Sequence, residues 1–292
     1  MTHIQVQAVL YNTSFSDLFH SASSVAASAA GSGVDVELHY GDASSSPCLA
    51  SKQIQALESE LGIAVSYYYF SENTGYGKGH NYLAEKCAAD YILPMNPDIV
   101  VESTFFDNML KPYLADSTVG IVEARQTPIE HPKCYDYKTG ATDWCSGACF
   151  IIPASLYREL GGFDSDTFWM YCEDVDLSWR VMNAGYKLKY QPMAAVFHAK
   201  RLTDSAHIVP SDTERYYSGL TALTFAYKWS NDKRLDSLMK QFATDGDPLH
   251  AKALNEFNLM RAEGRLPDRL VAPVSVRKNW HKGIMSEHRF TL

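Results

Sequence analysis

The chain up to residue 126 alternates short apolar segments with amphipathic ones, joined by connections of only a few residues. The apolar segments have the length and composition of strands, and the amphipathic segments have the 3.6-residue periodicity of helices. Strands are predicted at residues 6–11, 34–40, 64–70, 91–95 and 119–122, and helices at residues 15–30, 52–61, 80–88 and 103–114. This alternation is typical of a mostly parallel sheet covered by helices on both faces, because each parallel connection has to cross back over the sheet.

Beyond residue 126 the pattern becomes less regular. An irregular loop extends to residue 144, and short strands are predicted at residues 147–153, 187–190 and 194–197, with helices at 154–160 and 175–184. From residue 212 the pattern is helical, with segments at 213–229, 233–243 and 248–263. We therefore predict an α/β fold. A Rossmann-like, doubly wound sheet occupies residues 1–205, and a helical C-terminal extension occupies residues 206–292.

Composition excludes several classes of protein. The net charge of −8 argues against a surface that binds nucleic acid. No apolar run approaches the roughly 20 residues that span a bilayer, and the amino terminus lacks the pattern of a signal peptide. The six cysteines include no Cys-x-x-Cys pair, so free thiols in a reducing cytoplasm are expected.

Polar residues follow several of the predicted strands at their carboxyl ends. Asn12 follows the first strand, Asp42 the second, a glycine-rich loop the third, and Asn96-Pro97-Asp98 the fourth. Sheets of this kind bind ligands at this edge, because the loops that leave the strands converge there. The agreement of four positions predicts a ligand site at the carboxyl edge.

The glycine-rich loop spans residues 73–81 and carries Gly75, Gly77 and Gly79 between Asn73 and Asn81. Glycines allow backbone amides to approach a phosphate or a base, and the start of a helix favours an anion. The spacing matches neither a Walker loop nor the dinucleotide fingerprint. A tight turn is the structural alternative; the position at the ligand edge favours nucleotide binding.

Two groups of side chains indicate chemistry at the same edge. Asp98, after a buried strand, offers a carboxylate to a divalent cation, and His198 ends a second apolar strand. A turn at Asp98 and a packed histidine are the structural alternatives. Glu173 and Asp174 open a predicted helix. Capping explains one acidic residue at a helix start, with Asp174 as the N-cap, but it does not explain the second.

These motifs together resemble the family-2 glycosyltransferases with the GT-A fold, and especially their rhamnosyltransferase-like branch. The resemblance extends from Val6 to His198. It is carried by the following motifs: the loop of residues 73–81, Asn96-Pro97-Asp98, Trp144-Cys145-Ser146-Gly147-Ala148, Gly161-Gly162-Phe163-Asp164, the block from Phe168 to Arg180, Ala184-Gly185-Tyr186 and the terminal His198.

The resemblance implies a GT-A type sheet and an inverting enzyme that uses a nucleoside-diphosphate sugar. It assigns the general base to Asp174, a Mg²⁺ or Mn²⁺ ion to Asp98 and His198, and the acceptor side to Trp144 and Glu173. The donor would be bound by Asn12, Asp42, Asn73, Gly75, Gly77, Lys78, Gly79, Asn81 and Asn96. Asn96 replaces the first aspartate of the usual Asp-x-Asp, and Gly41-Asp42 replaces the usual Asp-Asn pair.

The predicted reaction moves a sugar, with dTDP-rhamnose as the expected donor, to a hydroxyl of a saccharide or lipid-linked saccharide in surface polysaccharide synthesis. Chemically, such a displacement needs a base for the hydroxyl proton and positive charge beside the departing diphosphate. A non-catalytic module that binds a nucleotide or sugar is one alternative, and a nucleotidyltransferase is another. The first would not need Asp174; the second normally has a basic glycine loop after the first strand.

The C-terminal tail is basic and aromatic although the whole chain is acidic. Between Arg261 and Leu292, Lys and Arg outnumber Asp and Glu, and Trp280 and Phe290 lie among them. Peripheral contact with anionic lipid at the inner face of the membrane is one interpretation. A solvated tail and a contact between copies in a homo-oligomer are the others.

Overall fold

The computed structural model describes residues 1–130, 133–198 and 210–277. One sheet of eight strands runs through the molecule in the order β3-β2-β1-β4-β7-β6-β8-β5. Its strands are β1 (His3–Leu10), β2 (Asp35–Asp42), β3 (Ala64–Tyr69), β4 (Tyr91–Pro94), β5 (Ile99–Val101), β6 (Val119–Thr127), β7 (Phe150–Pro153) and β8 (Lys187–His198).

The sheet combines two parallel halves. Strands β3, β2, β1 and β4 are parallel to one another, as are β6 and β8. Strand β7 lies between the halves and is antiparallel to both neighbours, and β5 is antiparallel to β8 at the edge. The predicted mostly parallel α/β sheet is therefore confirmed.

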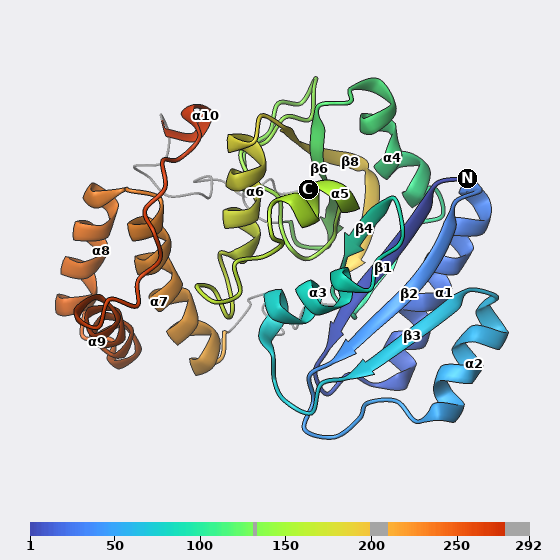
Figure 1. Cartoon of the computed structure of the whole chain (residues 1–292), viewed down its shortest axis with the longest axis horizontal. Coiled ribbons are helices and arrows are strands. Elements are labelled where there is room, and N and C mark those ends of the chain that lie inside the picture. The colour runs from blue at the N-terminus through green and yellow to red at the C-terminus, as the bar shows by residue number, and fades with distance from the viewer. Residues whose placement is uncertain (131–132, 199–209, 278–292) are drawn as a thin grey trace.

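Helices cover both faces of the sheet (Figure 1). Each face of the sheet has its own apolar core. Helices α1 (Phe15–Ser32), α2 (Ser51–Leu61) and α4 (Phe105–Ala115) contribute to one core, which includes the buried Leu18 and Phe105. Helices α3 (Gly75–Glu85), α5 (Ala154–Glu159) and α6 (Glu173–Asn183) contribute to the other, which includes Leu156 and Leu177. Burial on both faces stabilises the parallel strands, and in β1 even the polar Gln5 and Gln7 are buried.

The helical extension forms its own group at one end of the molecule (Figure 1). Helices α7 (Asp212–Lys228), α8 (Asp232–Thr244) and α9 (Pro248–Ala262) enclose an apolar core, and α10 (Val274–Arg277) follows. A further cluster, with Trp179 of α6 and Phe225 and Trp229 of the extension, joins this group to α6. The boundary predicted at residue 205 lies outside the described residues.

Three local predictions were wrong. Helix α3 begins at Gly75 instead of near His80, so the glycine-rich segment is itself helical. The two strands predicted at 187–190 and 194–197 are one strand, β8, interrupted by a shift in register after Gln191 where Pro192 follows. Strand β5 has only three residues and was not predicted.

No helix in the described part of the chain combines the length and the apolar character needed to cross a membrane. All six cysteines are described, and each is a free thiol.

Of the tail, only its beginning is described, and there Arg265 pairs with Glu263 and Glu256 while Arg269 pairs with Asp232. Trp280 and Phe290 lie outside the described residues.

Candidate active site

A carboxylate, an amide and an imidazole meet at the carboxyl edge of the sheet. Asn96 and Asp98 lie between β4 and β5, and His198 is the last residue of β8, where it pairs with Ile99. His198 Nε2 lies 3.4 Å from Asp98 Oδ1 and 3.2 Å from Asn96 Nδ2. Asn96 and His198 are more than a hundred positions apart in the chain, and the structure brings them together with Asp98, as the sequence predicted.

The hydrogen bonds of His198 leave Nε2 as the ring atom that offers a lone pair. His198 Nδ1 lies 2.9 Å from Gln126 Oε1, and Gln126 Nε2 donates to Ser146 Oγ at 3.3 Å. Because the Gln126 oxygen faces the ring, Nδ1 carries the proton and donates it. An imidazole fixed in this tautomer by an outer hydrogen bond is the form that binds metals.

This donor set fits a divalent cation. A carboxylate oxygen and an imidazole nitrogen suit Mg²⁺ or Mn²⁺, and the Asp98 side chain is about one third exposed, at 37%. Asn96 turns its amide nitrogen toward His198. Within residues 1–130, 133–198 and 210–277, no three His, Cys, Asp or Glu side chains form a group that could hold a metal. Oxygens from a substrate would therefore have to complete the coordination.

Asp174 is held by backbone amides near the start of α6. The helix begins at Glu173, and its N-cap is Cys172, so the prediction of Asp174 as the N-cap was wrong. Tyr171 and Cys172 both have left-handed backbones, with φ of 70° and 66°, which turns the chain sharply into the helix. Asp174 Oδ2 accepts from Gly147 N, and Oδ1 from Val175 N, each at 2.8 Å.

One short backbone segment connects Asp174 with the histidine group. Gly147 N donates to Asp174, and the carbonyl oxygen of the next residue, Ala148, accepts from Asn96 N at 2.9 Å. Two adjacent residues therefore fix the acidic helix start and the possible metal ligands relative to each other. Gly147 leaves little room for a side chain, since an added Cβ would lie 3.3 Å from Tyr76 Oη and 3.4 Å from Asp174 Cβ.

The two carboxyl groups at the start of α6 have unequal surroundings. Burial raises the pKa of Asp174, while the hydrogen bonds from Gly147 and Val175 and the charge of Lys133 act in the opposite direction. Burial and then the charge of Asp174 raise the pKa of Glu173 to about 8. Asp174 is thus the carboxyl group whose ionised form the protein supports.

Trp144 is packed into the protein beside this pair. Its side chain is only 4% exposed and belongs to the cluster between α6 and the helical extension. Lys133 Nζ lies 4.0 Å from the centre of its ring, donates to the Trp144 carbonyl at 3.0 Å and pairs with the buried Glu123. The predicted contact of Trp144 with an acceptor stays a prediction; in this structure the ring packs in the cluster that also contains Val175 of α6.

The glycines of α3 have a packing reason that the sequence did not show. A Cβ on Gly79 would lie 2.6 Å from Val9 Cγ2, and one on Gly77 would lie 3.1 Å from Phe163 Cβ. Gly75, with φ of +71°, would place its Cβ 2.6 Å from the Trp169 carbonyl oxygen. Close helix packing explains all three residues, which is why they are tolerated within a helix despite their low helical propensity.

The polar residues that flank these glycines differ in their availability. Asn73 is exposed and accepts from Gly75 N at 3.1 Å, and the exposed Lys78 pairs with Glu72 at 3.1 Å. Asn81, in contrast, binds Phe163 through both its oxygen and its nitrogen and accepts from Tyr157 Oη at 2.7 Å. In this structure Asn81 thus holds the turn at Phe163, and its predicted contact with the donor stays a prediction.

Asp42 is likewise turned inward. Its side chain is 0% exposed and accepts from Ser44 N at 2.9 Å, from Cys48 N at 2.6 Å and from Tyr67 Oη. Burial acts to raise its pKa, but these hydrogen bonds outweigh burial and lower it. In this structure Asp42 thus shapes the loop after β2, where Ser44 Oγ also accepts from Asn12 N at 2.8 Å, and its predicted contact with the donor stays a prediction.

Sequence reasoning missed three residues of the site, namely Tyr76, Gln126 and Lys133. Tyr76 lies on α3, and its hydroxyl donates to the Gly147 carbonyl. Burial, followed by the charges of Glu173 and Asp174, raises its pKa well above the ordinary value. No motif marks these residues, because each reaches the site through a contact distant in sequence.

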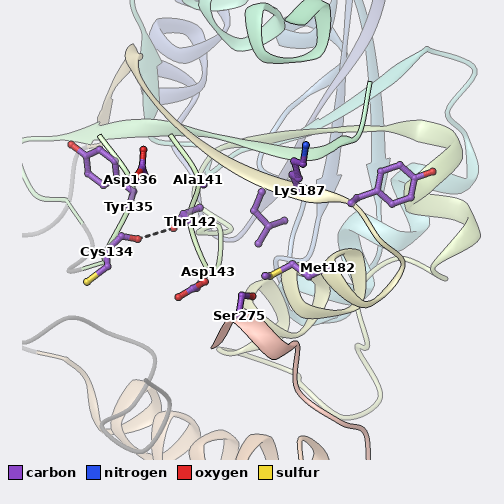
Figure 2. Close-up of a pocket in the computed structure, with 11 residues that line it drawn as sticks. Cys134, Tyr135, Asp136, Ala141, Thr142, Asp143, Met182, Lys187 and Ser275 are labelled. Atoms are coloured by element: carbon purple, nitrogen blue, oxygen red, sulfur yellow. Dashed lines mark hydrogen bonds between the residues drawn. The ribbon is translucent and has the colours of Figure 1, made fainter. Parts of the chain in front are cut away.

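Two hollows lie away from Asp174 and from the group of Asn96, Asp98 and His198. One, of about 330 Å³, lies between residues 134–143, the end of α6 and Ser275 (Figure 2), and its lining includes none of the predicted site residues. The other, of about 360 Å³, is lined by Asn81, residues 160–166, Arg180 and Lys228. Of the predicted site residues, only Asn81 borders either hollow.

Comparisons with known proteins agree with the geometry. No protein-family model matches the chain. The chain is 29% identical over 194 residues to rhamnosyltransferase WbbL of Escherichia coli (strain K12), covering 53% of this chain and 67% of that protein. It is 44% identical over 57 residues to N-acetylglucosaminyl-diphospho-decaprenol L-rhamnosyltransferase of Mycobacterium tuberculosis, 20% of this chain and 18% of that one.

The fold is similar to that of a solved glycosyltransferase, GalNAc-T7 crystallised with UDP, GalNAc and Mn²⁺. The TM-score is 0.61 at 15% identity, over 91% of this chain and 55% of that one. The chain thus spans two thirds of one curated relative and less than a fifth of the other. By sequence the chain is similar to rhamnosyltransferases, and its fold is the GT-A fold of glycosyltransferases.

Proposed function

We propose that this protein transfers a sugar, with inversion, from a nucleoside-diphosphate donor to a hydroxyl of a saccharide or lipid-linked saccharide. One observation carries the proposal: adjacent residues of one backbone segment bind both Asp174 and Asn96, and Asn96 lies beside Asp98 and His198. A base and a place for a diphosphate are the two elements that this displacement needs. The similarity to two rhamnosyltransferases favours dTDP-rhamnose as the donor.

In the proposed reaction Asp174 accepts the proton of the acceptor hydroxyl as its oxygen bonds to the anomeric carbon. The bond between that carbon and the diphosphate oxygen breaks, and the electron pair leaves with the nucleoside diphosphate. Gly147 N and Val175 N hold the carboxylate in place before the transfer. Ionised Asp174 is required, so the rate should rise with pH until this group has lost its proton.

Asp98 and His198, with Asn96 beside them, would hold Mg²⁺ or Mn²⁺, which supplies positive charge to the departing diphosphate. The solved neighbour that contains UDP and Mn²⁺ supports this assignment. Donor contacts are proposed for Asn12, Asn73 and Lys78, with the glycines of α3 and the loop organised by Asp42 shaping the same pocket.

A transfer assay tests the proposal. Purified protein is incubated with dTDP-rhamnose or other nucleotide sugars, an N-acetylglucosaminyl-diphospho-prenol acceptor, and Mn²⁺ or a chelator. Asp174→Asn should lower the turnover about two to four orders of magnitude while donor binding, measured by calorimetry, stays nearly unchanged. Asp236→Asn, an exposed aspartate on α8, is the matched control. Near-normal transfer by folded Asp174→Asn protein would reject Asp174 as the base, and donor binding without transfer by the wild type would favour a non-catalytic module.

We further propose that the protein works in the cytoplasm at the inner face of the membrane, where a lipid-linked acceptor would be found. Co-sedimentation with anionic vesicles, compared for the full chain and a chain ending at Leu270, tests a tail contact with lipid. Light scattering of the same two proteins tests the alternative, a contact between copies of the chain.

A further inference from the structure

The Glu173 side chain is buried in the site, and one of its two carboxyl oxygens has no hydrogen-bond partner among the described residues. It is 8% exposed at the first position of α6, and among the described residues its Oε2 atom has no hydrogen-bond partner. A buried polar atom without a partner costs roughly 1–3 kcal/mol, so such atoms are rare unless a ligand uses them. Its immediate neighbour in the chain is the proposed base, Asp174.

The charges around Glu173 disfavour its ionised form. Asp174 and Asp176 on the same helix both act to raise its pKa, after burial, which is the larger cause. The groups that face it from other segments are Tyr76 of α3 and Tyr171 and Cys172 of the preceding turn, and each of these carries no charge while its proton is bound. Glu173 therefore lies among negative and neutral groups.

Asp174 differs from Glu173 in its partners and is only partly buried. Both of its oxygens accept backbone N–H groups, and the positive charge of Lys133 acts on it. When two carboxyl groups are close together, the better supported one ionises and the other keeps its proton. The pair is built to hold one proton on Glu173 and one negative charge on Asp174.

We propose that the Glu173 carboxyl group works in its protonated form and donates a hydrogen bond from Oε2 to a hydroxyl oxygen of the acceptor saccharide, next to the hydroxyl that attacks. This inference rests on the proposed transferase function. It gives Glu173 a binding task that a carboxylate cannot perform, since an ionised carboxyl group only accepts hydrogen bonds. It also explains why Asp174 remains available as the base.

Replacement by Gln and by Met separates this role from the alternatives. Gln is neutral and keeps a donor, so the loss of kcat/KM in Glu173→Gln at pH 7 should be about tenfold smaller than the loss in Glu173→Met. Met is similar in length but donates nothing, so Glu173→Met should raise the acceptor KM about 10- to 100-fold, as expected for a lost hydrogen bond in a site built to make it. Glu159→Gln, on the exposed surface of α5, is the control.

The pH profile adds a readout that a merely structural role would not change. Wild-type activity should fall above pH 8, where Glu173 loses its proton and repels Asp174, whereas Glu173→Gln should lack this alkaline fall. A loss in Glu173→Gln as large as that in Glu173→Met would overturn the inference, because it would show that the ionised carboxylate is needed.

Difference infrared spectroscopy tests the protonation without any transfer assay. The wild type should show a protonated carboxyl band at pH 7 that is missing from Glu173→Gln and present in Glu159→Gln. Absence of the band would refute the inference even in an active enzyme. Presence of the band in a protein that transfers no sugar would instead reject the proposed function.

Discussion

Replacement of Lys228 by Met should destabilise the protein by about 3 kcal/mol, because it removes the cation from a buried group of charges. Lys228 ends α7 and is 5% exposed. Its Nζ atom lies 2.6 Å from Asp164 Oδ2 and 2.6 Å from Asp176 Oδ1. It therefore ties the helical extension both to the turn at Asp164 and to the helix that carries Asp174.

The magnitude follows from what remains after the substitution. Loss of one partner from a buried ion pair costs about 3–5 kcal/mol, because the other charge stays buried. Asp176, which is 0% exposed, keeps hydrogen bonds from Arg180 Nε at 2.8 Å and Trp229 Nε1 at 3.0 Å. Asp164 is 25% exposed and can regain water. Both facts favour the lower end of the range, equivalent to a decrease in Tm of about 6 °C for a chain of this size.

Urea and thermal unfolding of the wild type, Lys228→Met and Lys233→Met measure this cost. Lys233 is an exposed lysine of α8 and should tolerate the same change. The double variant Asp164→Asn with Lys228→Met should recover part of the loss, because it removes one of the unpaired carboxylates. If Lys228→Met unfolded at the same urea concentration and temperature as the Lys233→Met control, the reasoning would be refuted, because the buried ion pairs of Lys228 would then contribute nothing to stability.

Three further predictions concern packing, metal and pH. Gly79→Ala should cost about 1–3 kcal/mol in urea unfolding, since its Cβ would lie 2.6 Å from Val9, whereas Gly31→Ala, with 3.6 Å to the nearest atom, should be harmless. Gln126→Leu should weaken Mn²⁺ binding, measured by calorimetry, about 10- to 100-fold through loss of the bond to His198; unchanged affinity would contradict the assigned tautomer. Glu173 has a folded pKa of about 8 against 4.5 for the free group, so the unfolded chain loses its proton first and stability falls as pH rises between these values. Glu173→Gln should thus be about 3 kcal/mol more stable than the wild type at pH 7 and equal to it at pH 4, and parallel stability curves would contradict this.

The sequence predicted the sheet because strand and helix periodicities are local properties. It also predicted that Asp98 and His198 would meet, since both follow apolar strands and strands of this type end at one edge. It did not predict the start of α3, because the glycines that disfavour a helix are required by contacts with Val9, Phe163 and Trp169, far away in the chain. Packing determines such positions, and no local pattern records it.

The sequence also did not show in which direction a polar side chain points. Asp42 and Asn81 were assigned to the donor because of their chemistry and position, yet both bind segments of their own protein. An acid or amide at a strand end serves a ligand or a loop equally well, and only the available donors and acceptors around it decide which. Gln126 and Lys133 show the opposite case. No motif marks them, yet Gln126 binds His198 and the charge of Lys133 acts on Asp174.

The two hydrogen bonds made by Gly147 and Ala148 have a consequence for engineering. Since adjacent backbone groups bind both Asp174 and Asn96, the spacing between the proposed base and the proposed metal ligands is set by this short turn before β7. Grafting a new segment after β2 or β3 should change which nucleotide sugar is accepted, while the proposed base and metal ligands stay in place. Replacements that lengthen or shorten residues 145–149 should, in contrast, separate the proposed base from the proposed metal ligands and yield proteins that bind but do not react.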